Sequence, residues 1–205
     1  LINYLALLGW SNESDKEKHS LEELVSVFDS ARIQKSGAQF DIKKATWINH
    51  LHIKEASTKK IIKASGKKFD ELVSLFGEDR SNQVVSLVKE RLNLIVDLQK
   101  EVGFFLNSPS SYDPKVLNKL NKEEALIVLK FCTLEVRVSK DSAAIKEGLF
   151  RESTKNKISF GQTMKTLRLA IVGALKGPDL FKIVEIIGTS ETLKRINKLT
   201  KTLKQ

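Results

Sequence analysis

Apolar positions along the chain recur with the spacing of amphipathic helices, and no convincing series of alternating strand positions appears. Residues 20–23 (Ser-Leu-Glu-Glu) have the form of a capping box, in which the serine hydroxyl accepts a hydrogen bond from the amide three residues later and the glutamate reaches back. Asn121 offers a similar helix start before the apolar run 125–129. The pattern therefore predicts an all-α protein.

Glycine and proline mark the ends of the last helices. Gly177 and Pro178 are expected to end one helix and open the next, because proline suits the first helical turn and breaks anything longer. Gly188 is a candidate C-cap, and Ser190 is a candidate N-cap for the final helix. The sequence thus predicts two helix breaks in this region.

The segment 107–114 is the best candidate for a boundary between domains. It holds two of the three prolines of the chain and three serines, which is a composition typical of loops. A second, weaker break lies at residues 56–58, where the pattern changes to a basic amphipathic stretch. We expect the chain to divide at these two points.

A helix is predicted over residues 83–98, and one charged residue stands out in it. At 100° per residue, Val84, Val88 and Ile95 fall on one apolar stripe, and Arg91 falls in its middle. A buried guanidinium without acceptors is costly, so this side chain needs partners. Two interpretations remain open. One is a salt bridge to another helix or a side chain that reaches the domain edge, and the other is an acceptor supplied by a ligand.

Most of the basic excess lies near the end of the chain. The 205 residues carry a formal net charge of +10; residues 1–125 hold 19 Lys/Arg and 18 Asp/Glu, whereas residues 126–205 hold 16 and 7. Compositional drift toward lysine is one explanation. The other is a C-terminal module that meets phosphate groups, preceded by a nearly neutral module. The local surplus of cations favours an RNA or DNA face.

A catalytic centre is hard to build from these residues. Cys132 lies in an apolar stretch typical of a core, and as the one cysteine it makes no internal disulfide, which fits a reducing cytoplasm. His50 and His52 are two residues apart, so on a helix they diverge by about 200° and cannot share a metal. No Walker or dinucleotide-type glycine loop appears, and no apolar run approaches the roughly 18–20 residues of a spanning helix.

The first ten residues have neither an initiator methionine nor a polar cap before the apolar side chains. This pattern is typical of the inside of a helix that belongs to a longer protein. A signal peptide is the alternative, but no basic leader or small-residue cleavage site accompanies it. We therefore expect residues 1–205 to be a C-terminal fragment.

Several segments, taken in order, resemble the bacterial glutamyl-tRNA synthetases. One group resembles the region just downstream of that family's lysine-rich signature loop and comprises residues 5–11, residues 35–41, Lys44, Trp47, Asn49 and Ile53. Another group resembles the family's C-terminal signature and comprises residues 161–162, residues 167–168, Gly173, residues 177–181, residues 187–188 and residues 193–195. The match is collinear over essentially the whole chain.

The resemblance implies a class I synthetase of the cytoplasm that joins glutamate to its tRNA with ATP and Mg²⁺. The catalytic nucleotide-binding fold of the family would lie before Leu1, so the fragment is expected to bind tRNA, to need no cofactor and to aminoacylate nothing alone. The implied partner is the tRNA for glutamate and, in some family members, the tRNA for glutamine. Neither DNA nor a membrane is an implied partner, and a monomer is expected.

The resemblance also implies an architecture. It is an all-α fold in which a helical stem-contact region, residues 1–58, precedes two helical-bundle subdomains of the α-helix-cage type. The first anticodon-binding subdomain would span residues 59–110. The second, basic one would span residues 111–205.

Individual contacts follow where the match is clear. The residues matched to tRNA-stem contacts are Lys35, Lys44 and Trp47, although a tryptophan in this position is more often a core anchor. Arg91 matches the arginine that reads the third anticodon base. The matches to contacts with the first two bases are Arg151, Arg168, Gly177 and Leu180.

Two positions depart from the family pattern. Gln34 stands where a small hydroxyl residue is expected. Gly177 replaces a threonine-type contact and offers only its backbone.

The chemistry of the third anticodon base suits an arginine. Anticodon bases are unstacked, so their Watson–Crick edges are open to side chains. Cytosine presents O2 and N3 as adjacent acceptors for an arginine fork, whereas uracil has an N–H donor at N3; such a contact is worth about 1–3 kcal/mol of discrimination. The alternative function is a non-catalytic helical scaffold that binds an acidic protein partner through residues 126–205.

Overall fold

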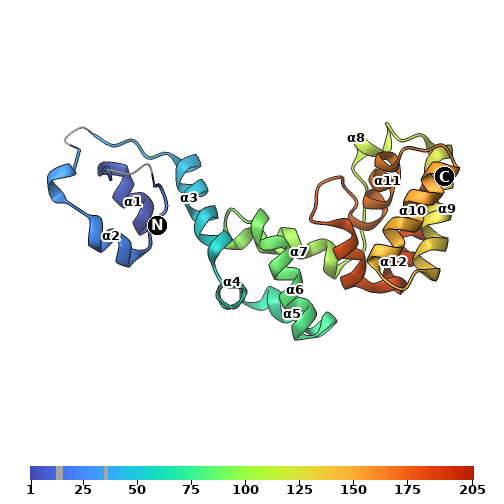
Figure 1. The fold of residues 1–205 in the computed structure, drawn as a ribbon, viewed down its shortest axis with the longest axis horizontal. Helices are drawn as coiled ribbons and strands as arrows, with labels where there is room; N and C mark the ends of the chain where they lie inside the picture. The colour runs from blue at the N-terminus through green and yellow to red at the C-terminus, as the bar shows by residue number, and fades with distance from the viewer. Residues whose placement is uncertain (13–15, 35–36) are drawn as a thin grey trace.

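The computed structural model describes residues 1–12, 16–34 and 37–205, and Figure 1 shows them as an elongated molecule built of helices. Among these residues the one strand-like feature is a single antiparallel bridge between Trp10 and Ile33. The predicted all-α fold is confirmed. The helices follow one another along the long axis, from the N-terminal group through a middle group to a C-terminal bundle.

The N-terminal group comprises α1 (Ile2–Gly9), α2 (Leu21–Val27), the 3-10 helix η1 (Ser30–Arg32) and α3 (Ile42–Glu55). The capping box predicted at residues 20–23 is present: the Ser20 hydroxyl accepts from the Glu23 amide at 3.1 Å, and the Ser20 amide donates to the Glu23 carboxylate at 2.9 Å. The Asp41 amide donates to the buried Tyr4 hydroxyl at 2.6 Å, which links the start of α3 to α1.

The middle group comprises α4 (Thr58–Ser65), α5 (Lys67–Phe76), α6 (Glu78–Val88), η2 (Lys89–Arg91), η3 (Ile95–Asp97) and α7 (Leu98–Leu106). The helix boundary predicted at residues 56–58 is confirmed, since α3 ends at Glu55 and the Ser57 side chain caps α4.

The single helix predicted over residues 83–98 is wrong. The α-helix stops at Val88, and the chain turns through η2 to an extended Leu92, whose side chain is fully buried. The Asp97 carboxylate accepts from the amides of Asn93 and Leu94 at 3.2 and 2.8 Å, which replaces helical hydrogen bonds with local ones. Arg91 therefore does not lie within an apolar helical stripe.

The C-terminal bundle comprises α8 (Pro114–Leu117), α9 (Lys122–Val138), α10 (Ser142–Lys155), α11 (Phe160–Val172) and α12 (Leu180–Lys204). The start predicted at Asn121 is confirmed, because its side chain accepts from two amides of the first turn of α9. The long helices α9 and α12 pack against each other, and α11 contacts both. Cys132 is fully buried in this core, as predicted, and burial raises the pKa of its thiol.

The break expected at Gly177 and Pro178 falls elsewhere. The left-handed Gly173 ends α11, with φ of +82°, and the Asp179 side chain caps the start of α12. Gly177 and Pro178 therefore lie in the loop between these helices. Gly188 interrupts α12 with φ of +78°, so the second predicted break is confirmed as a kink.

The segment 107–114 connects α7 to α8 and packs against the end of α11. The Asp113 amide donates to the carbonyl of Gly173 at 2.8 Å. The division of the chain into subdomains at residues 58 and 110 stays a prediction. Within the parts of the chain described above, no helix is both long and apolar enough to cross a membrane.

We predict that Gly173→Ala destabilises the protein by about 2 kcal/mol or more, because the left-handed backbone strains any other L-residue. An added Cβ would also lie 2.9 Å from the Ser111 carbonyl oxygen. The measurement is the free energy of unfolding in urea.

The matched control is Gly161→Ala in the first turn of α11, where an added Cβ meets nothing within 4 Å. This substitution should leave stability unchanged or raise it by up to about 1 kcal/mol. Equal losses from both substitutions would contradict the packing described for residues 107–114.

Candidate nucleic-acid interface

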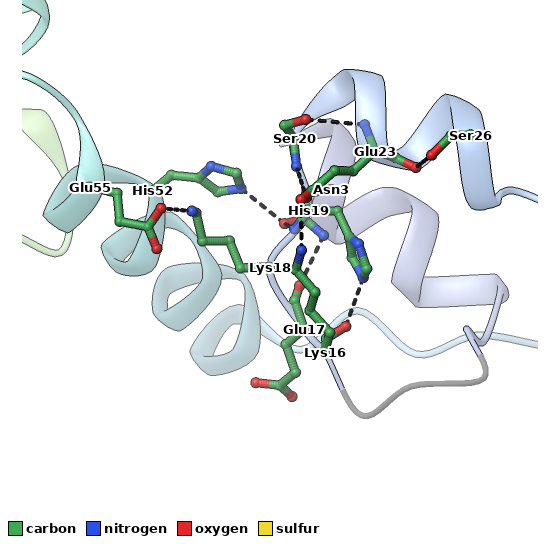
Figure 2. Close-up of polar contacts among 10 residues, drawn as sticks. All are labelled: Asn3, Lys16, Glu17, Lys18, His19, Ser20, Glu23, Ser26, His52 and Glu55. Atoms are coloured by element: carbon green, nitrogen blue, oxygen red, sulfur yellow. Dashed lines mark hydrogen bonds and ion pairs between the residues drawn. The ribbon is translucent and has the colours of Figure 1, made fainter.

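A buried asparagine organises the N-terminal group (Figure 2). The Asn3 side-chain oxygen accepts from the His19 amide at 3.0 Å and bonds to Nε2 of His52 at 2.9 Å, while its nitrogen donates to the Glu17 carbonyl at 3.0 Å. Asn3 on α1 thus ties the segment before α2 to α3. This arrangement holds the Glu17 backbone beside α3.

Glu17 brings two of the predicted stem-contact residues together. One carboxylate oxygen lies 3.4 Å from the Lys44 ammonium, and the other accepts from the Trp47 indole N–H at 3.2 Å. Trp47 is 51% exposed and stacks on His50, so it is not the core anchor that its residue type favours. The third predicted residue, Lys35, lies outside the described residues. An exposed indole beside a lysine suits a sugar–phosphate surface.

Helix α3 also holds the turn that follows Arg91. The Asn49 side chain donates to the carbonyl of Asn93 at 2.6 Å, and Nδ1 of His50 bonds to the carbonyl of Leu92 at 2.9 Å. The two histidines of α3 therefore have different partners. Within the described residues, no cluster of three metal-ligating side chains occurs.

Arg91 forms a salt bridge with α7. Its Nε lies 2.6 Å from the Glu101 carboxylate, and the two side chains are 35% and 18% exposed. Of the two interpretations left open by the sequence, the structure shows the protein partner. The terminal Nη groups make no hydrogen bond within the part of the chain that the structure describes. Those groups are available to an acceptor from outside.

Arg168 lies on α11 at the loop that leads into α12. Its Nη1 donates to the Pro178 carbonyl at 2.8 Å, and a Cβ added at Gly177 would lie 3.0 Å from the same nitrogen. The glycine that departs from the family pattern therefore leaves room for this guanidinium. Burial lowers the pKa of Arg168; Asp179 opposes that effect, and the positive charge of Arg91 adds to it. Arg91 and Arg168 are thus within electrostatic reach of each other, although they come from different groups of helices.

Arg151 on α10 is held by a glutamate of the neighbouring helix. Its Nη2 lies 3.1 Å from the Glu135 carboxylate, which is 10% exposed, while 69% of the arginine side chain is exposed. A Cβ at Gly148 would lie 1.8 Å from that carboxylate, so the glycine makes space for the pair. Leu180 is different: it is 1% exposed and packs in the core at the start of α12. Its side chain does not face solvent, so a base contact at this position would have to use the backbone.

A family model described as an anticodon binding domain matches residues 60–200. The chain belongs to the anticodon-binding domain family. The helices that carry Arg91, Arg151 and Arg168 all lie within the matched residues.

The chain is similar to glutamate–tRNA ligases. It is 38% identical over 204 residues to the ligase of Flavobacterium johnsoniae and 34% identical over 205 residues to that of Porphyromonas gingivalis, with 99% of the chain covered in both. The crystal structure of a glutamate–tRNA ligase from Elizabethkingia meningosepticum matches 98% of the chain with a TM-score of 0.87 at 31% identity. The resemblance inferred from sequence is confirmed. The chain spans about two fifths of the length of these relatives (41%, 41% and 40%).

Sequence reasoning missed the residues that hold the candidate contacts in place. These are acidic and polar partners: Glu17, Asn49, His50, Glu101 and Glu135. Of these pairs, Arg91 and Glu101 lie closest in sequence, 10 residues apart. A helix break that the hydrophobic pattern did not reveal lies between them. The other partners are brought in by tertiary packing.

We predict that protonation of His52 weakens the N-terminal group of helices. Burial, followed by the charge of Lys18, holds the pKa of His52 below its ordinary value of 6.5. As pH falls from 7.5 to 5.5, the unfolded chain takes up the proton more readily than the folded one, so stability declines. The measurement is the free energy of unfolding across this range.

In His52→Gln the amide nitrogen can still donate to Asn3, but the side chain does not titrate. This variant should flatten the pH dependence of the free energy of unfolding. His50→Gln, which leaves His52 in place, should keep that dependence. If His52→Gln leaves the pH dependence of the free energy of unfolding unchanged, His52 is not the group responsible for it.

Proposed function

We propose that this chain is the tRNA-recognition part of a glutamate–tRNA ligase. In the complete enzyme, which would join glutamate to its tRNA in the cytoplasm with ATP and Mg²⁺, the chain would bind the anticodon and the stem. It would aminoacylate nothing without the rest of the enzyme. The partner is the tRNA for glutamate, bound by one copy of the chain.

The observation that carries this proposal is a pair of anchored arginines from separate groups of helices: Glu101 binds only Nε of Arg91, and the Pro178 carbonyl binds Nη1 of Arg168. Arg91 follows α6 and Arg168 lies on α11; burial lowers the pKa of Arg168, and the positive charge of Arg91 adds to that effect. Two like charges held near each other in a protein favour an anion or a row of acceptors between them. A single-stranded triplet offers both, because its phosphates are anionic and its base edges are open.

Each arginine is prepared for a different part of such a ligand. Glu101 takes only Nε of Arg91, which leaves the planar Nη fork for the O2 and N3 acceptors of a cytosine. We assign Arg91 to the third anticodon base. Arg168 is anchored at Nη1 by the Pro178 carbonyl, and together with Arg151 it is assigned to the first two bases.

The stem contact is assigned to the exposed face formed by Lys44 and Trp47. Glu17 orients both side chains, and α3 carries them about one turn from Asn49 and His50, which hold the turn after Arg91. Helix α3 would therefore connect the stem contact to the turn that follows Arg91 when one tRNA is bound to both. Lys35 is assigned to the same contact by the family match alone.

The test compares the tRNA for glutamate with an unrelated tRNA by gel shift at one fixed salt concentration, since phosphate contacts alone depend strongly on salt. We expect tighter binding of the glutamate tRNA. Equal, weak binding of both RNAs would contradict the proposal and leave a general polyanion-binding or scaffold role.

We predict that Arg91→Ala weakens binding of a tRNA with cytosine at the third anticodon base by about 1–3 kcal/mol. The same tRNA with that base changed should hardly be affected, so selectivity is lost. Stability should change by no more than about 1 kcal/mol, because the Arg91–Glu101 pair lies near the surface. The two measurements are the affinity ratio of the two tRNAs and the free energy of unfolding.

Arg80→Ala is the matched control, since it removes the same charge from the exposed side of α6. It should reduce the affinity for both tRNAs equally. If Arg91→Ala instead lowers stability by several kcal/mol and leaves the affinity ratio unchanged, the role of Arg91 is purely structural.

A further inference from the structure

A buried arginine lies at the junction between the middle helices and the C-terminal bundle. Arg195 on α12 is 1% exposed and is the largest fully buried side chain of the described residues. Its Nε donates to the Glu191 carboxylate at 2.9 Å, and its Nη1 donates to the carbonyls of Phe104 and Ile171 at 2.6 and 2.8 Å. Both carbonyls belong to the last turns of helices, α7 and α11, where carbonyl groups lack partners within the helix.

The positions of these two carbonyls relate Arg195 to the proposed base contacts. Phe104 lies three residues after Glu101, the partner of Arg91, and Ile171 lies three residues after Arg168. One guanidinium nitrogen therefore joins the helix that holds Arg91 to the helix that carries Arg168.

Two neighbours on the same face of α12 hold the segment that leaves α7. Glu191 and Lys198 are placed four residues before and three residues after Arg195, so all three side chains share one helical face. The Ser108 hydroxyl donates to the Glu191 carboxylate at 2.5 Å, and the Lys198 ammonium donates to the Pro109 carbonyl at 2.5 Å. We call Glu191, Arg195 and Lys198 the α12 triad.

The Coulombic attraction to Glu191 alone does not account for a buried guanidinium at this place, because desolvation offsets much of that gain. What the guanidinium of the α12 triad adds is directional bonding, which fixes the ends of two helices relative to a third. Although burial acts against it, hydrogen bonds from Ser108 and Arg195 hold the pKa of Glu191 below its usual value, so the carboxylate stays charged.

We propose that Arg195, supported by Glu191 and Lys198, is a positioning residue for anticodon recognition that sets the spacing between Arg91 and Arg168. The inference rests on the proposed function. A ligand that needs both arginines binds more tightly when they are already held at the right separation, since less freedom is lost on binding.

The first test measures the junction without RNA. Spin labels are attached at Ser86→Cys on α6 and Glu147→Cys on α10, both at exposed positions, while the native Cys132 is buried and stays unlabelled. The distribution of distances between the labels should be narrow. It should broaden in Arg195→Lys, because an ammonium cannot reproduce the guanidinium geometry, and in Lys198→Ala.

The matched control is Lys194→Ala. It removes the same charge from the same helix, but Lys194 pairs with Glu191 one turn away and not with the segment that leaves α7. Its distance distribution should equal that of the unaltered chain. If Arg195→Lys does not fold, as judged by circular dichroism, the surface variant Lys198→Ala carries the test, since its side chain is not in the core.

The second test measures affinity for the glutamate tRNA. We expect Arg195→Lys to bind roughly tenfold more weakly and to lose part of the selectivity for the third base, although Arg91 is intact. A lowered thermal midpoint with unchanged distances and unchanged selectivity would overturn the positioning role. If the unaltered chain does not bind the glutamate tRNA selectively, the proposed function and this inference are both overturned. If it binds selectively but the label distances are the same in the unaltered chain and in the Arg195 and Lys198 variants, this inference alone is overturned.

Discussion

The guanidinium of Arg195 must find acceptors because it is buried, and this requirement shapes the centre of the molecule. Its partners are the Glu191 carboxylate and the carbonyl ends of α7 and α11. These groups can meet only if the middle helices end against the face of α12. The junction is therefore set by hydrogen bonds of fixed direction, in addition to apolar packing that tolerates sliding.

A second link of the same kind lies at the other end of the middle group. Asn49 and His50 of α3 bind carbonyls of the turn after Arg91, which gives this irregular stretch the partners that a continuous helix would have supplied. The Lys44–Trp47 face, Arg91 and Arg168 are thus connected through α3, α7 and α11. In the proposed function, a single tRNA would use this series of contacts from its stem to its anticodon.

Local signals in the sequence predict the local structure well. The capping box at residues 20–23, the cap at Asn121 and the kink at Gly188 depend on neighbouring residues, and all three are found. The helix over residues 83–98 failed because the Asp97 carboxylate binds two amides of this stretch, and the distant Asn49 and His50 bind two of its carbonyls. The same holds for the candidate site. The sequence resemblance identified the arginines, but the acidic residues that orient them come from other helices, and the hydrophobic pattern does not indicate them.

The proposed function depends most on Arg91, which would cover the Watson–Crick edge of the third anticodon base. Dimethyl sulfate methylates N3 of an unpaired cytosine, so its reactivity at this base in the glutamate tRNA measures that contact directly. We expect the base to be protected by the unaltered chain and to become reactive again with saturating Arg91→Ala, while the stem contacts persist. A third anticodon base that stays fully reactive when the tRNA is saturated with the unaltered chain would contradict the assignment of Arg91.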